Sequence, residues 1–150
     1  MFGPETDLLS GQNLVVCEAG CAEAEKVASD MFTGTAVNIV HIPIEKHDLY
    51  MTWVLNLPHL MNLIMGDLLF KSGVPHDMLS SLGGTTFNKQ LSVTDEVMSE
   101  NPDLYFHIQQ INKHRDELRS AFIESLDNIH NSDKKDSFVS IMKNWETMSR

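Results

Sequence analysis

The chain has 150 residues, of which 42% are hydrophobic and 21% are charged, a composition that excludes intrinsic disorder. Its 21 acidic side chains outnumber 11 Lys and Arg side chains, and the formal net charge of -10 opposes binding to nucleic acid or an anionic membrane. Only Cys17 and Cys21 are present, which is typical of a reducing compartment. Met1 to Asp7 lack the positive charge and apolar run of a targeting segment, so we expect a cytoplasmic protein.

The first 43 residues have the pattern of a β-α-β unit. The apolar run Leu14 to Cys17 predicts a buried strand, and residues 20–32 place apolar side chains at helical spacing. The segment Ala36 to Ile42 returns to strand-forming residues and stops at Pro43. Because one crossover cannot bury both faces of a parallel sheet, we expect this unit to be the end of a larger α/β domain.

From residue 44 to 150 the pattern is helical. Glu45 to Phe70 predicts one long helix that is kinked near its middle by Pro58. Leu49 to Phe70 holds 15 apolar residues in 22, but polar residues interrupt it and exclude a membrane span. Apolar side chains cover nearly the whole circumference of this helix, so we expect a second copy of the chain to enclose it in a homodimer.

Further helices are expected beyond this one. Gly73 and Pro75 end the long helix, and Thr85 and Thr86 are candidates for the N-cap of a later one. An apolar stripe from Asp103 to Ile129 predicts a second long helix. The complete set of expected helices after Gly73 covers residues 75–82, 87–99, 103–129 and 133–149. The fold class is therefore mainly α, with an α/β remnant at residues 1–43.

Few residues form a recognisable chemical site. Cys17 and Cys21 lack further ligands at metal spacing, so we interpret them as ordinary thiols, one of them buried. His107 and His114 share one face of the expected second long helix without a partner carboxylate, and we predict no metal site. The sequence has no glycine-rich phosphate loop, so a self-contained nucleotide-binding enzyme is not expected.

His59 follows Pro58 inside the most apolar helix, where an unpaired imidazole is costly. One interpretation is a core histidine whose hydrogen bonds are satisfied. The other is a site residue, because a proline kink beside a buried titratable group frees backbone carbonyls and opens a cavity. Composition does not choose between the two.

A series of short motifs resembles the C-terminal portion of prephenate dehydrogenase, closest to archaeal versions. The resemblance covers nearly the whole chain in order, and its motifs are Met1 to Pro4, Glu45 to Asp48, Leu57 to His59, Gly84 to Phe87 and Asn101 to Tyr105. It implies the end of a Rossmann domain at residues 1–43 and an all-helical dimerisation and substrate-closing domain at residues 44–150. The family serves tyrosine biosynthesis by oxidatively decarboxylating prephenate or arogenate, with NAD or NADP as the hydride acceptor.

The resemblance also implies roles for individual residues. It puts His59 at the substrate pocket, with Lys89 and Tyr105 as further substrate-binding candidates. His47 and Asp48 match the family pattern and are expected to be a structural pair at the start of a helix. We expect no catalytic or cofactor-binding residue in this chain, because the family's His-Pro pair and dinucleotide fingerprint would precede Met1. The cofactor would then be bound in the complete enzyme, and a separate Rossmann-domain chain is one source of that half.

Glu96 stands where the family commonly has an arginine that binds a substrate carboxylate. Lys89 is the nearest cation that could substitute for it. The acidic side chain favours an alternative function, a non-catalytic or regulatory homodimeric module derived from this family. A third alternative is an unrelated metal or redox protein that uses Cys17 and Cys21.

Overall fold

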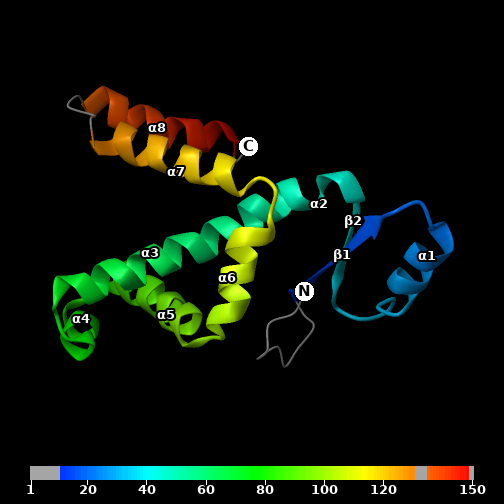
Figure 1. Ribbon diagram of the computed structural model, residues 1–150, viewed down its shortest axis with the longest axis horizontal. Helices are drawn as coiled ribbons and strands as arrows, with labels where there is room; N and C mark the ends of the chain where they lie inside the picture. The colour runs from blue at the N-terminus through cyan, green and yellow to red at the C-terminus, as the bar shows by residue number, and fades with distance from the viewer. Residues whose placement is uncertain (1–10, 131–134, 149–150) are drawn as a thin grey trace. The chain divides into compact units, whose positions relative to one another are not determined.

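The computed structural model describes residues 11–130 and 135–148, and the side chains of all of these except 135–137. The chain divides into two compact units, Met1–Val54 and Leu55–Arg150. This division falls within a continuous run of helix, and the domain boundary expected after residue 43 stays a prediction. The fold class is confirmed, because a small two-stranded sheet precedes a series of helices (Figure 1).

The first unit contains the expected β-α-β arrangement. Strand β1 (Asn13–Glu18), helix α1 (Ala22–Asp30) and strand β2 (Asn38–Pro43) follow one another along the chain. The strands pair in parallel with Val16 opposite His41, and α1 packs against β1. The prediction of a strand, a crossover helix and a second strand is therefore confirmed.

The helical run after β2 differs from the single kinked helix that the sequence predicts. Helix α2 (Ile44–Met51) passes through a π-helical turn (Thr52–Asn56) into α3 (Leu57–Ser72). Pro58 has no N–H to donate to the carbonyl of Val54, and its ring crowds that carbonyl. The wider π turn relieves this conflict just before the proline, so the irregularity precedes Pro58.

Helix α3 ends at Gly73, whose φ of 69° is left-handed, as its sequence predicts. The short helix α4 (His76–Leu82) follows, and then α5 (Thr85–Ser99) packs along α3. The N-cap expected at Thr85 or Thr86 is wrong. Gly84 takes the N-cap position, and its carbonyl accepts the backbone N–H of Asn88 at 2.9 Å.

The second long helix expected over residues 103–129 is two helices, α6 (Pro102–Ile111) and α7 (Arg115–His130). Asn112 has an extended ψ of 126°, and its side chain accepts the backbone N–H of His114 at 2.8 Å. This local hydrogen bond competes with continued helix and allows the chain to turn. Helix α8 (Lys135–Met148) follows and runs opposite to α7 (Figure 1). Residues 131–134, between α7 and α8, lie outside the described residues.

Buried side chains of the second unit are a mixture of apolar and polar residues. The buried set is Asn56, Asn62, Leu91, Thr94, Val97, Tyr105, Gln109 and Leu118. Asn62 is the one buried side chain of α3, the most apolar helix of the chain. Within residues 11–130 and 135–148, no helix has both the length and the apolar character needed to cross a bilayer.

Candidate functional site

His59 on α3 and Tyr105 on α6 form the centre of the candidate site. Their ring centroids are 4.7 Å apart and the rings meet edge to face at 68°. His59 is partly buried, and its Nδ1 atom is enclosed without a hydrogen-bond partner among the described residues. A buried polar atom without a partner is uncommon in a folded protein, and one explanation is a ligand or water that satisfies it.

Burial lowers the pKa of His59 below its ordinary 6.5, because desolvation disfavours the imidazolium. The ring is therefore mostly neutral at pH 7, with one nitrogen donating and one accepting a hydrogen bond. A neutral imidazole can accept a proton or a hydrogen bond from a bound molecule.

Tyr105 lies beside a pocket of about 310 Å³ that is formed by residues of α3, α5 and α6. Burial raises the pKa of Tyr105, and the negative charges of Glu100 and Glu96 raise it further. The phenol is therefore protonated at neutral pH and can donate a hydrogen bond. The pocket is lined by Leu63, Val97, Met98, Glu100, Pro102, Tyr105, Phe106 and Gln109.

Two polar networks hold the helices around His59. Asn62, one turn further along α3, accepts hydrogen bonds from Gln90 at 2.8 Å and Thr94 at 2.9 Å, which fixes α5 to α3. Asn56 donates to the carbonyl of Ile108 at 2.8 Å, and Gln109 donates to the carbonyl of Asn56 at 3.0 Å. These hydrogen bonds tie α3, which carries His59, to α5 and to α6, which carries Tyr105.

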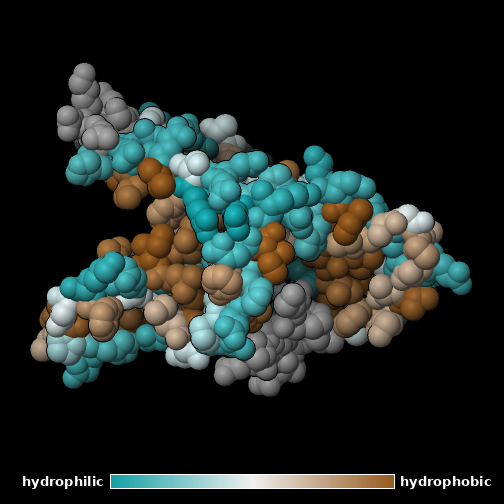
Figure 2. Space-filling view, viewed as in Figure 1, coloured by the Kyte–Doolittle hydropathy of each residue, from teal (hydrophilic) through white to brown (hydrophobic). Residues whose placement is uncertain are grey.

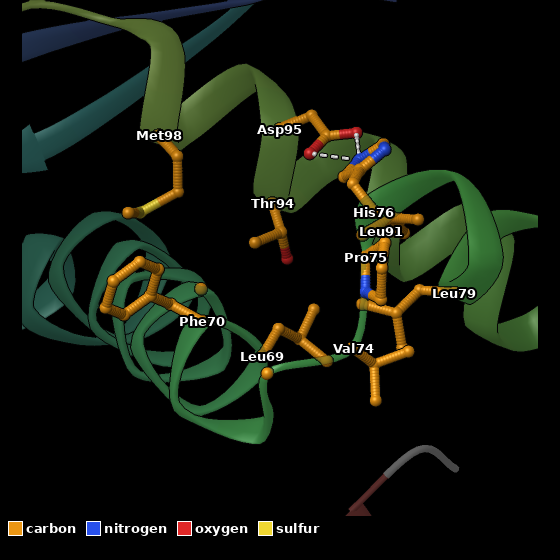
Figure 3. Close-up of a pocket in the computed structure, with 12 residues that line it drawn as sticks. Leu69, Phe70, Val74, Pro75, His76, Leu79, Leu91, Thr94, Asp95 and Met98 are labelled. Carbon is orange, nitrogen blue, oxygen red and sulfur yellow. Dashed lines mark hydrogen bonds and ion pairs between the residues drawn. The ribbon is translucent and has the colours of Figure 1, made fainter.

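A second cavity, of about 440 Å³, opens between the end of α3, helix α4 and helix α5 (Figure 3). We call it the α3–α5 groove. Its lining is mostly apolar, with Leu69, Phe70 and Met98 around it, and His76 pairs with Asp95 at 3.0 Å. Gly66 on α3 allows Met98 of α5 to pack closely against α3, because a Cβ at position 66 would lie 2.8 Å from the Met98 sulfur. Phe70 is 86% exposed beside this groove.

The remaining predicted residues are not brought to His59. Lys89 is exposed on α5 and lines neither of these two cavities. His47 and Asp48 lie on α2 and form a pair at 3.1 Å, in agreement with a structural role. Cys17 is half-buried and Cys21 is exposed, so the expectation of one buried thiol is wrong.

The histidines predicted to share a helix face are separated by the break between α6 and α7. His107 bonds the carbonyl of Asp103 at 2.6 Å, and His114 pairs with Glu117 at 2.9 Å. In the part of the chain that the structure describes, no three His, Cys, Asp or Glu side chains gather closely enough to hold a metal ion.

The turn between β1 and α1 does not fit a dinucleotide. A Rossmann fingerprint needs three glycines there, for the tight turn, the approach of the pyrophosphate and helix packing. This chain has Gly20 alone, with a φ of 84°, followed by Cys21 at the N-cap. The β1–α1 turn therefore lacks the glycine spacing of a dinucleotide fingerprint.

Sequence comparisons agree with this architecture. The family model described as the dimerization domain of prephenate dehydrogenase matches residues 43–144, which span α2 to most of α8. The chain belongs to this family. It is also 25% identical, over 95% of its length, to a probable arogenate/prephenate dehydrogenase of Methanocaldococcus jannaschii. It covers 33% of that relative's length.

Several residues of the site were not predicted from the sequence. Glu100, Phe106 and Gln109 line the pocket beside Tyr105. A signal for part of the site was present, because Asn56, His59 and Asn62 are spaced by three residues and form a polar stripe on an apolar helix. No comparable signal in the sequence marks Phe106 or Gln109. They lie on α6, and the sequence did not predict that this helix ends at Ile111.

Proposed function

We propose that this chain is the dimerising and substrate-binding portion of an enzyme that oxidatively decarboxylates prephenate or arogenate in tyrosine biosynthesis. The observation that carries the proposal is the buried, unpartnered Nδ1 of His59 beside Tyr105, in a chain whose helical part matches the family's dimerization domain. The hydride acceptor, NAD or NADP, would be bound by a cofactor domain outside these 150 residues.

In this proposal His59 and Tyr105 bind and orient the substrate. The protonated phenol of Tyr105, which lines the pocket, donates a hydrogen bond to a substrate oxygen, while His59 contacts the Tyr105 ring edge to face and orients it. The apolar walls of the pocket exclude water from the substrate ring, which strengthens this hydrogen bond. Lys89, which is exposed on α5, is a third candidate, and its ammonium group would bind a carboxylate of the substrate.

We further propose that the α3–α5 groove is covered by a second copy of this chain. The match to a dimerization domain includes every residue of the groove. Figure 2 shows hydrophobic surface over α3, the helix on which Leu68 is 59% and Phe70 is 86% exposed. Contiguous apolar surface of this kind usually marks an interface. A homodimer would remove it from water without any other partner.

Glu96 supports a second candidate function, a non-catalytic homodimeric module. Its negative charge acts on Tyr105, at the position where the family commonly has an arginine. A repulsive charge opposes a substrate with two carboxylates. If this candidate is correct, neither prephenate nor arogenate binds to the site.

Binding of both compounds to the 150-residue chain, measured by titration calorimetry, tests the proposal. We expect at least one of them to bind, and His59→Ala to weaken that binding at least about tenfold, or 1.4 kcal/mol. His76→Ala is the matched control, because His76 lies at the rim of the other cavity. Absence of binding by both compounds at millimolar concentration would contradict the proposed function and favour the non-catalytic module.

A further inference from the structure

Met98 borders both the α3–α5 groove and the pocket beside Tyr105. It lies near the end of α5 and lines each of these cavities. Among the described residues it is the one residue common to the two linings. Met98 is also 52% exposed. One partly exposed side chain therefore forms a wall of both cavities.

The Met98 side chain packs against the backbone of α3 at Gly66. A Cβ at position 66 would lie 2.8 Å from its sulfur, 2.9 Å from its Cγ and 3.1 Å from its Cε, so the methionine occupies the space that a larger residue would need. Methionine is unbranched and flexible, and it changes conformation readily. The position of Met98 between the two cavities therefore depends on the glycine beneath it and on what packs against its exposed side.

The exposed side of Met98 faces the groove. Figure 3 shows Met98 reaching from α5 toward Phe70 of α3, which is 86% exposed. A second copy of the chain that covers the groove would contact both side chains and restrict Met98 to one conformation. In a monomer the same side of Met98 meets water, and exposed side chains exchange rotamers rapidly.

We propose that Met98 couples dimerisation to ligand binding in the pocket beside Tyr105. The second copy holds Met98 against Gly66, and Met98 held in this way completes the wall of the pocket. Met98 is thus a positioning residue, and the pocket is incomplete in the monomer. The inference rests on the proposed function, because it takes the groove as the dimer interface and the pocket as the substrate site. Such coupling is reciprocal, so a ligand in the pocket tightens the dimer by the same factor by which the dimer tightens the ligand.

Sedimentation equilibrium of the 150-residue chain measures this reciprocal effect. The probe is prephenate or arogenate, whichever binds the wild type more tightly, and at saturation we expect it to lower the Kd of the dimer at least about fivefold. In a chain with 13C-labelled methionine methyl groups, the Met98 signal is assigned by its loss in Met98→Leu. It should shift both on dilution to the monomer and on addition of the probe. The signal of Met31, which lies outside the matched dimerization domain, is the control and should not shift.

Gly66→Ala displaces Met98 without altering the methionine itself. The added Cβ pushes the Met98 sulfur away from α3, while alanine favours the helix more than glycine does. We expect the Kd of the dimer and the Kd of the probe each to rise at least about tenfold. Gly84→Ala is the matched control, because a Cβ there meets no atom within 4 Å and Gly84 lines neither cavity. It should leave both values unchanged.

Met98→Ala completes a double-mutant cycle with Gly66→Ala. Without the methionine side chain, the Cβ added at position 66 has no sulfur to displace. We therefore expect Met98→Ala to weaken both dimerisation and probe binding, and Gly66→Ala to have no further effect in that background. Circular dichroism verifies that each variant is folded.

The results distinguish the coupling from the proposed function on which it rests. A dimer Kd that is unchanged by saturating probe, or additive effects of Gly66→Ala and Met98→Ala, would overturn the coupling while leaving the pocket and the interface intact. Binding of neither prephenate nor arogenate would overturn the proposed function, and a monomeric wild type would overturn the interface. Either of these last two results would overturn the coupling as well.

Discussion

His59 is a titratable side chain whose environment favours its uncharged form. Burial lowers its pKa below 6.5, and the Nδ1 atom has no partner among the described residues that could stabilise the cation. In the unfolded chain the same imidazole is hydrated and accepts a proton more readily. Folding is therefore coupled to pH through this residue.

We expect the free energy of unfolding to fall as the pH is lowered through 6.5, because the unfolded chain then binds a proton that folded His59 resists. The stability that His59 contributes by staying neutral is fully present above the pKa that it has in the unfolded chain. It is lost as the pH falls through the lower pKa that His59 has in the folded protein. For one proton the slope is at most about 1.4 kcal/mol per pH unit. Urea unfolding of the wild type at several pH values between about 5 and 8 measures it.

His59→Gln isolates this contribution from those of the other histidines, since glutamine does not titrate. The slope of stability against pH should be shallower in this variant below pH 6.5. Above about pH 7 the difference between the two proteins is constant and reports only the change in packing. Identical slopes would show that His59 is not desolvated in the folded protein.

At the scale of elements, Asn62 joins α3 to α5. It is 4% exposed, donates to the carbonyl of Pro58 at 2.8 Å and accepts from Gln90 and Thr94. Asn62→Ala removes all three hydrogen bonds, and Gln90 loses its acceptor, while the Thr94 hydroxyl keeps the carbonyl of Gln90 at 2.9 Å. We expect a loss of about 2–3 kcal/mol in the free energy of unfolding, measured by urea denaturation.

Asn144→Ala is the matched control for this substitution, because Asn144 is exposed on α8. Surface replacements of this kind usually change stability by less than about 0.5 kcal/mol. If Asn62→Ala and Asn144→Ala have equal effects, the Asn62 network does not hold α3 against α5.

The sequence predicts elements where local signals agree and fails where local and tertiary effects compete. Strands β1 and β2 and the end of α3 at Gly73 follow directly from apolar runs, Pro43 and a left-handed glycine. The π turn before Pro58 was missed, because proline allows either a kink or a wider turn. The break between α6 and α7 was missed because the apolar stripe continues across Asn112, apart from a seven-residue gap from Ile111 to Leu118.

The candidate site was predictable only in part for a similar reason. His59 was identified because its polarity conflicts with its helix, and Tyr105 came from the family resemblance. Their contact at 4.7 Å requires α6 to cross α3, which no periodicity encodes. Lys89 was selected for its charge alone, and the structure leaves it exposed and away from the lining of the pocket.

At the scale of the whole molecule, the chain leaves many large apolar side chains in water. On α3 and α4 alone, Met61, Leu68, Phe70, Met78 and Leu82 are each about half or more exposed. On α8, the apolar side chains of Phe138, Met142 and Trp145 are also exposed. Burial of a large apolar side chain contributes about 1.5–3 kcal/mol, so their joint exposure favours association.

We therefore expect the chain to be a dimer at micromolar concentration and Phe70→Glu to shift it toward the monomer. A carboxylate at position 70 would have to be buried without a partner against the α3–α5 groove, which costs several kcal/mol and weakens dimerisation at least about a hundredfold. Light scattering during size-exclusion chromatography measures the mass. Met31→Glu is the matched control, because Met31 is 73% exposed, precedes β2 and lies outside the matched dimerization domain. A wild-type protein that is monomeric and melts cooperatively would contradict the dimer, and a dimeric Phe70→Glu variant would exclude the α3–α5 groove as its interface.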